Sequence, residues 1–348
     1  MVAEELAVHF SVGATAPPRE SDCSPRPVVA RHATNTMQED ERDVRDVREK
    51  LVSHAKQYEV VRKLHDVPPH VTHEVRVDGK RAVYKRARSS DGNPAVEAEV
   101  IRHVARNTSV PVPEILGVGS DYFIAEWHDE VPEETSVDEE RARAMGAGLA
   151  TLHDETAFEA TGFLRNDDGD LALDADETWH GTVCEFLASR REFVEPFGYG
   201  DVATDALEFV RKNPGLFDGA GDPVLCHGNF LPEHVGTDGD EVTCVIDFEH
   251  AIVAPGEYDY WRTALPIFTG PSGTNDALAE AFRIGYESVR SLPAGFDRRR
   301  ELYWMVNAVS YFRSLFLQRQ QTGQESARTA RGFREYVYET IDSLETKP

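Results

Sequence analysis

The chain has 348 residues, of which 62 are acidic and 37 basic, so its formal net charge at pH 7 is −25. A surface with this charge repels phosphate backbones, which argues against a nucleic-acid partner. No apolar run approaches the roughly 20 residues that a membrane span needs, so we expect no membrane segment.

The acidic residues are spread along the whole chain, and only 7 of the 37 basic residues are lysines. An evenly acidic, lysine-poor surface suits concentrated salt, because high ionic strength screens the repulsion between like charges. We therefore interpret the composition as halophilic; a binding role for the negative charge is the alternative.

The cysteines and the N-terminal sequence indicate a cytoplasmic protein. The four cysteines are widely spaced and form no C-x-x-C pair, which suits buried thiols in a reducing compartment. The opening MVAEELAVHF has neither a basic stretch nor a long apolar run, so we expect no secretory signal.

Residues 1–36 are polar and turn-rich, with the stretch APPRESDCSPRP, and this predicts a disordered tail. The pattern changes at Met37, which is a candidate start residue. From there apolar side chains recur near helical spacing, from Val44 through Leu51 to Val60, and predict a helix.

Strand signals follow. The stretch VTHEVRVDGKRAVYKRAR alternates on both sides of Asp78-Gly79, which predicts a hairpin with a tight turn. Residues 94–106 predict a helix with proline in its first turn, and the runs EILGVG and YFIAEW predict two more strands. Residues 37–128 are therefore expected to form a helix and a small antiparallel sheet.

The remainder, residues 129–348, is expected to be mostly helical. Ser136 and Glu139 form a capping-box signal before a helix, and three more helices are predicted near 276–291, 297–320 and 326–345. The predicted fold class is α+β, with a small antiparallel-sheet N-terminal lobe and a larger, mostly helical C-terminal lobe.

One hairpin interrupts the helical part, within residues 224–251, VLCHGNFLPEHVGTDGDEVTCVIDFEHA. Val235 and the run EVTCVI flank the turn at Asp238-Gly239, so these segments should pair antiparallel. Counting back from this turn places His234 roughly opposite Asp247. Polar side chains that converge at strand ends are typical of catalytic sites.

These residues resemble a known family. CHGNFLPEH, CVIDFEHA and PGEYDYW are similar to the aminoglycoside phosphotransferase and choline-kinase-like pattern of H-G-D-x-x-x-x-N, then I-D-[FW]-[ED], then G-x-x-x-D. Upstream, VYK, VEAEVIRHVA, SVPVPEILG, IAEW and GLATLH match further family segments in the same order, so the resemblance spans about residues 67–345. It implies a protein-kinase-like fold and transfer of phosphate from ATP or GTP to a small hydroxylated molecule.

The resemblance implies that Lys85 and Glu97 pair and hold the nucleotide phosphates. The residue pattern agrees, because Lys85 shares a strand face with Val83, and Glu97 shares a helix face with Ile101. A lysine that snorkels from an edge strand and a surface glutamate are the alternatives.

Further roles are carried over by the same resemblance. Glu126, Trp127 and His128 lie in the segment that joins the lobes and are candidate nucleotide contacts. Asp247 is the candidate Mg²⁺ ligand, because hard cations bind carboxylate oxygens, with a turn-capping aspartate as the alternative. Asp259 is implied to anchor the catalytic loop.

Three features depart from the family pattern. Asn229 replaces the catalytic aspartate beside His227, the second candidate catalytic residue, and an amide cannot act as a general base. His234 replaces the second metal-ligating amide, and imidazole binds Mn²⁺ or Zn²⁺ better than Mg²⁺. The segment VPPHVTHEV contains no glycine where a phosphate-covering loop is expected. Glu233 is a candidate substitute acid.

Three functions remain open from the sequence. The first is a nucleotide-dependent small-molecule phosphotransferase that uses Mg²⁺ or Mn²⁺ and has weakened catalysis. The second is a pseudokinase that serves as a nucleotide-binding scaffold. The third is a Mn²⁺ or Zn²⁺ hydrolase with a site built from His227, His234, Asp247 and His250. Glu249 and His250 are expected to reach the same end of the hairpin, with solvent-facing or locally satisfied side chains as the alternative.

Overall fold

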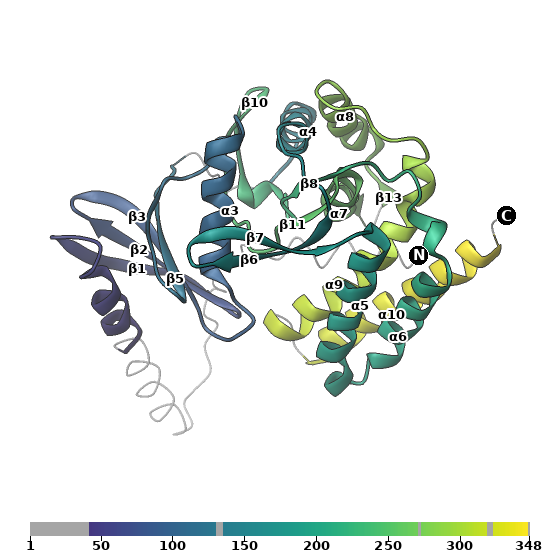
Figure 1. Ribbon diagram of the computed structural model, residues 1–348, viewed down its shortest axis with the longest axis horizontal. Helices are drawn as coiled ribbons and strands as arrows, with labels where there is room; N and C mark the ends of the chain where they lie inside the picture. Colours follow the sequence, from purple (N-terminus) through teal and green to yellow (C-terminus); the bar gives the residue numbers. More distant parts are fainter. Residues whose placement is uncertain (1–41, 130–134, 271–272, 319–322, 347–348) are drawn as a thin grey trace, which may run out of the picture. The chain divides into compact units, whose positions relative to one another are not determined.

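The computed structural model describes residues 42–129, 135–270, 273–318 and 323–346 (Figure 1). The predicted tail at residues 1–36 and the candidate start at Met37 lie outside these residues. The described chain divides into two units, one of residues 42–94 with 115–127, the other of residues 95–114 with 128–346.

The first unit contains a five-stranded antiparallel sheet in the order β1-β2-β3-β5-β4. Its strands are β1 (Tyr58–Val67), β2 (His70–Val77), β3 (Lys80–Ala87), β4 (Ile115–Val118) and β5 (Tyr122–Glu126). β2 and β3 pair over their whole length around Asp78-Gly79, both of which have positive φ, so the predicted hairpin is confirmed. Only Pro68 and Pro69 join β1 to β2. A short proline turn therefore occupies the position where a glycine-rich, phosphate-covering loop was expected.

A helix at residues 42–51 packs on one face of this sheet. Its Val47 and Leu51 join Tyr84 and neighbouring strand residues in a buried cluster. The prediction that the helix reaches Val60 is wrong, because Val60 pairs with β2 as part of β1. Its β-branched side chain fits a strand better than a helix, and cross-strand pairing outweighs the helical spacing.

The first helix of the second unit is α3 (Pro94–Asn107), which belongs to it from Ala95 onward and has proline at its first position as predicted. The following helix α4 (Glu139–Asp154) is capped by Asp138, whose carboxylate accepts the backbone N–H of Arg141 at 2.9 Å. The predicted cap at Ser136 is therefore wrong. Aspartate two positions closer to the helix already satisfies one of the free N–H groups of the first turn.

A four-stranded sheet in the order β7-β6-β11-β8 lies within this mostly helical unit. Its strands are β6 (Thr161–Asp167), β7 (Asp170–Asp176), β8 (Pro223–Cys226) and β11 (Ile252–Pro255). The β6–β7 hairpin was not predicted from the sequence. β11 pairs with both β6 and β8, so this sheet holds the end of β8, where the loop with Asn229 begins.

The predicted hairpin after this loop is present as β9 (Val235–Asp238) and β10 (Glu241–Val245). Its turn residues are Gly239 and Asp240, one position later than predicted. The helices that complete the unit are α5 (Trp179–Val194), α6 (Gly200–Lys212), α7 (Gly256–Phe268), α8 (Asp276–Glu287), α9 (Phe296–Gln318) and α10 (Gly323–Thr346). The last three confirm the three predicted late helices. Within the part of the chain that the structure describes, no helix has the length and apolarity to cross a membrane.

Candidate functional site

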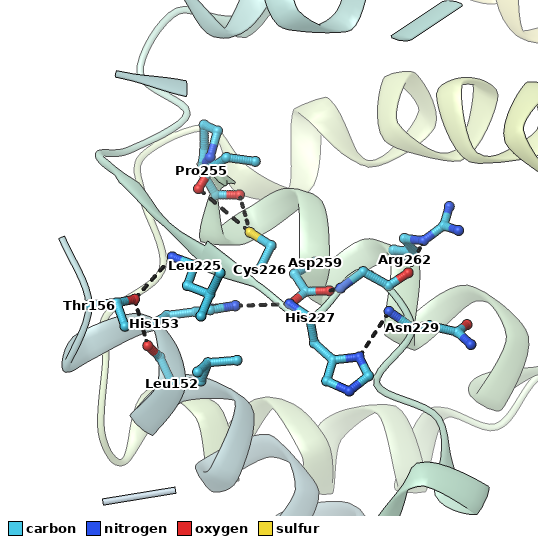
Figure 2. Close-up of polar contacts among 12 residues, drawn as sticks. Leu152, His153, Thr156, Leu225, Cys226, His227, Asn229, Pro255, Asp259 and Arg262 are labelled. Atoms are coloured by element: carbon cyan, nitrogen blue, oxygen red, sulfur yellow. Dashed lines mark hydrogen bonds and ion pairs between the residues drawn. The ribbon is translucent and has the colours of Figure 1, made fainter. Parts of the chain in front are cut away.

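Asp259, in the first turn of α7, holds the loop that follows β8 (Figure 2). Its carboxylate is fully buried and accepts the backbone N–H groups of His227 at 2.6 Å and Gly228 at 2.9 Å. His153 of α4 lies 3.2 Å from the same carboxylate through its Nε2. Asp259 therefore fixes the backbone of the loop directly before Asn229.

The charges around this carboxylate set its protonation state. Burial alone would raise the pKa of Asp259, but the hydrogen bond and charge of His153, the charge of His227 and the N–H of Gly228 together hold the pKa below its ordinary value. Burial lowers the pKa of His227 to about 4. At neutral pH the site therefore contains an ionised Asp259 and a neutral His227.

Both ring nitrogens of His227 are used within the chain. Its Nδ1 accepts the backbone N–H of Asn229 at 3.2 Å, and its Nε2 lies 2.9 Å from the carbonyl oxygen of Ile246. The neutral tautomer with the proton on Nε2 satisfies both contacts. His227 thus ties the loop to the residue just before Asp247.

Gly228 is required by the shape of this loop. Its φ is +76°, a region that favours glycine. A Cβ atom at this position would also collide with the carbonyl oxygen of His250. Backbone conformation and close approach both exclude a side chain here.

His234 and Asp247 meet beside Asn229, as the strand register predicted. The Nε2 of His234 lies 3.2 Å from Oδ2 of Asp247, and the Nδ1 lies 2.9 Å from the carbonyl oxygen of Asn229. Asp247 has a φ of +68°. The other described aspartates with positive φ, Asp78 and Asp168, lie in two-residue hairpin turns, whereas Asp247 does not.

These contacts define what the His234–Asp247 pair can bind. The carbonyl of Asn229 makes the shorter contact with Nδ1 of His234, at 2.9 Å, while Nδ2 of the Asn229 side chain lies 3.5 Å from the same nitrogen. Nε2 faces a carboxylate oxygen of Asp247, and this nitrogen and oxygen are near enough to bind one metal ion together. A backbone carbonyl that orients the far nitrogen is the usual arrangement around a metal-bound histidine.

No group of three or more possible metal ligands among the described residues includes His234 or Asp247. Glu249 lies 3.3 Å from Nε2 of its neighbour His250. Among the described residues, no three of His227, His234, Asp247 and His250 bring ligand atoms together. With both nitrogens of His227 already engaged, the geometry disfavours the hydrolase hypothesis.

The two candidate phosphate contacts are both buried within their own units. Lys85 lies on β3 with 8% of its surface exposed, opposite Phe123 of β5. Glu97 lies in the first turn of α3 with 2% exposed. The predicted pairing of Lys85 with Glu97 joins the two units and stays a prediction.

The three candidate nucleotide contacts at the end of β5 also belong to different units. Glu126 ends β5, and Trp127 follows it with the guanidinium of Arg81 at 3.6 Å from its ring centre. The backbone N–H of Trp127 also bonds to the carbonyl of Arg81 at 3.2 Å. His128 is the first residue of the second unit after this stretch.

One residue of the site was missed by sequence reasoning. Arg262 lies on α7 and donates through Nε to the carbonyl oxygen of Gly228 and through Nη1 to Oδ1 of Asn307 at 3.2 Å. Its position three residues after Asp259 was the available signal, because residues three apart share a helix face.

Comparison with known proteins agrees with this geometry. The model of the phosphotransferase enzyme family matches residues 70–302. No curated protein matches the chain.

Solved structures match nearly the whole fold. The aminoglycoside phosphotransferase APH(4)-Ia has a TM-score of 0.60 at 16% identity, covering 85% of this chain and 98% of its own. A candidate fructosamine-3-kinase of Thermobifida fusca has a TM-score of 0.59 at 18% identity, covering 84% and 98%. The macrolide 2′-phosphotransferase MphH of Brachybacterium faecium has a TM-score of 0.51 at 16% identity, covering 84% and 98%.

These similarities confirm the predicted α+β fold with two lobes of the protein-kinase-like kind. The family model covers well over half of the chain and includes β2, β3 and the whole loop with Asn229. The chain therefore belongs to the phosphotransferase enzyme family.

Proposed function

We propose that the protein transfers the γ-phosphate of ATP or GTP to a hydroxyl group of a small molecule. The observation that carries this proposal is the approach of His234 and Asp247 to 3.2 Å beside Asn229, at the end of the family's loop. The related fold of APH(4)-Ia has been captured in ternary complexes of hygromycin B with ADP or AMP-PNP. These complexes support a nucleotide donor and a hydroxylated acceptor.

Asp247 and His234 would hold the divalent ion. The carboxylate oxygen and Nε2 are close enough to bind one ion together, and Nδ1 is already oriented by the carbonyl of Asn229. The bound ion would neutralise charge on the transferred phosphate. A nitrogen ligand favours Mn²⁺ over Mg²⁺.

Asn229 would orient the acceptor hydroxyl. Its amide cannot take a proton, but its side-chain oxygen can accept a hydrogen bond from the hydroxyl group. General base catalysis typically contributes about 10²–10⁴ in rate. Because phosphoryl transfer depends mainly on positioning and charge neutralisation, the remaining groups support a slower reaction.

The other predicted residues take supporting roles in this proposal. Lys85 and Glu97 would hold the nucleotide phosphates, while Glu126, Trp127 and His128 would contact the rest of the nucleotide. Asp259 and His227 position the loop through the hydrogen bonds that they make with its backbone.

The test is transfer of label from [γ-³²P]ATP or GTP to a broad set of hydroxylated metabolites. Molar KCl suits the proposed halophilic surface, with Mg²⁺ or Mn²⁺ supplied in parallel. We expect transfer by the natural protein and none by Asp247→Ala. Asp168→Ala, which changes an aspartate of similar φ in a hairpin turn, should retain transfer. If neither the natural protein nor Asp247→Ala transfers label to any acceptor in the set, the proposal is contradicted.

Asn229 also supports a second candidate, a pseudokinase that binds nucleotide without transferring phosphate. Thermal denaturation with nucleotide and metal separates the two. A nucleotide-dependent rise in melting temperature without transfer to any acceptor would favour the scaffold.

A further inference from the structure

Arg262 is a buried cation at the edge of the candidate site. Only 6% of its surface is exposed. Its Nε and Nη1 donate to the carbonyl of Gly228 and to Asn307, and the guanidinium lies 5.3 Å from the ring centre of Tyr311. In Figure 2 the side chains of Arg262, from α7, and Asn229, from the loop, both lie on the side of Asp259 away from His153. A ligand held by Arg262 would therefore lie beside Asn229.

No carboxylate among the described residues forms a salt bridge with Arg262, although Tyr258 hydrogen-bonds to it and the charge of Asp259 acts on it. Arg299 is also deeply buried, and it provides a comparison because its charge is paired with a carboxylate. Its guanidinium bonds to Glu257 at 2.6 and 2.8 Å and to three backbone carbonyls. A buried charge without such a partner costs free energy, which an anionic ligand would recover.

Asn307 of α9 has an unpaired donor beside Arg262. It is fully buried, and its Oδ1 faces the guanidinium of Arg262, so the orientation of the amide is determined. The Nδ2 group then has no hydrogen-bond partner among the described residues. One turn earlier on the same helix face, Nε1 of the half-buried Trp304 also has none. A buried donor left unpaired costs about 1–3 kcal/mol.

The groups around Arg262 carry charges of both signs. Burial lowers the pKa of His250 to about 4, the charges of Glu249 and Asp247 raise it, and those of Arg262 and Arg190 lower it. The charge of Asp259 also acts on Arg262, but both oxygens of Asp259 already accept loop N–H groups. Asp259 therefore serves the loop rather than pairing with Arg262.

We propose that Arg262 and Asn307 form a subsite for an anionic group of the acceptor, a carboxylate or a phosphate. Guanidinium groups bind both by charge-assisted hydrogen bonds, and the unpaired Nδ2 of Asn307 lies beside the guanidinium of Arg262. This inference rests on the proposed function and names its substrate class, a hydroxy acid or a phosphorylated alcohol whose hydroxyl reaches Asn229.

The experiment uses matched acceptor pairs that differ only in the anionic group. The pairs are D-glycerate and glycerol, glycerol 3-phosphate and glycerol, gluconate and sorbitol, and pantothenate and panthenol. Label transfer and saturable shifts in melting temperature are both measured in molar KCl with the full chain. The glycerate and glycerol 3-phosphate arms distinguish a carboxylate from a phosphate as the bound group.

The decisive variant is Asn307→Asp, which keeps the side-chain shape and gives Arg262 a carboxylate. A purely structural role predicts unchanged or higher stability and unchanged acceptor affinity. The anionic subsite predicts that the KM or Kd of the anionic acceptor rises at least about 30-fold while the KM of ATP is unchanged. Asn275→Asp, which adds the same charge at the cap of α8, is the control and should change neither.

The outcomes separate this inference from the proposed function. Preference for the anionic member of at least one pair, lost in Asn307→Asp, supports the subsite. Transfer to neutral members as fast as to their anionic partners overturns the subsite and leaves the phosphotransferase intact. Binding of an anion that Asn307→Asp abolishes, without transfer to any acceptor, keeps the subsite and rejects the phosphotransferase. Absence of any anion-specific binding or transfer overturns the subsite.

Discussion

The carboxylate of Asp259 accepts the backbone N–H of His227 at 2.6 Å, although the two residues are 32 positions apart in the chain. This bond and its neighbour at Gly228 determine the path of the loop that presents Asn229. The proposed chemistry therefore depends on a buried acid that touches no substrate.

Replacing Asp259 by Asn should destabilise the fold by about 3 kcal/mol, because one loop N–H loses its charged acceptor in the core. Urea unfolding in molar KCl measures the change. Asp168→Asn, at an exposed turn, should stay within about 0.5 kcal/mol. The folded-state pKa of Asp259 lies below the ordinary 3.8, so its contribution is present above pH 3.8 and is lost as the pH falls through the lower folded value. A stability difference that did not shrink below pH 3.8 would contradict this explanation.

The neutral His227 should make the stability of the fold depend on pH in a higher range than Asp259 does. Its pKa is about 4 in the fold and 6.5 as its ordinary value, so the unfolded chain binds the extra proton first. Stability should therefore fall by about 3 kcal/mol as the pH drops from 6.5 to 4. In His227→Gln, measured by the same unfolding curves, the fall should be smaller. An equal fall in both proteins would show that other groups cause it.

Asn229→Asp should raise the rate of phosphate transfer about 10²–10⁴-fold, because it supplies the carboxylate that a general base requires. Single-turnover transfer of label at saturating acceptor reports this step, and the KM of the nucleotide serves as the internal control. A variant with unchanged or lower kcat would mean that another group takes the proton, or that the natural reaction does not need a base.

His234→Asn restores the amide of the family pattern and should exchange the metal preference. The natural protein should bind Mn²⁺ at least about tenfold more tightly than Mg²⁺, and the variant should lose most of this preference with the loss of the nitrogen ligand. Titration calorimetry with each metal in the presence of AMP-PNP measures both affinities. The same ratio in the two proteins would exclude Nε2 as a ligand.

Features set by local pattern were predictable from the sequence. The β2–β3 hairpin follows from alternation around Asp78-Gly79, and the meeting of His234 with Asp247 follows from counting residues back from one turn. The count was only approximate, because the turn lies one residue later than predicted and a bulge between Val242 and Cys244 shifts the pairing further.

Features set by competition or by distant contacts were not predictable. The β6–β7 hairpin is an exception that was overlooked, because Leu171 and Leu173 alternate along β7 and Asp168-Gly169 forms its turn. Asp138 competes with Ser136 for the same helix cap, and the sequence signal does not rank them. The role of Arg262 depends on Asn307, which lies 45 residues away on another helix.

Pulsed electron–nuclear double resonance of Mn²⁺ bound with AMP-PNP tests the central claim most directly. The proposed site predicts ³¹P coupling from the nucleotide and ¹⁴N coupling from His234 on the same ion. His234→Asn should abolish only the ¹⁴N coupling, and Asp247→Ala should abolish specific binding. An ion with phosphate coupling but no ¹⁴N coupling, or one that Asp247→Ala leaves unchanged, would contradict the assignment of this pair as the metal site.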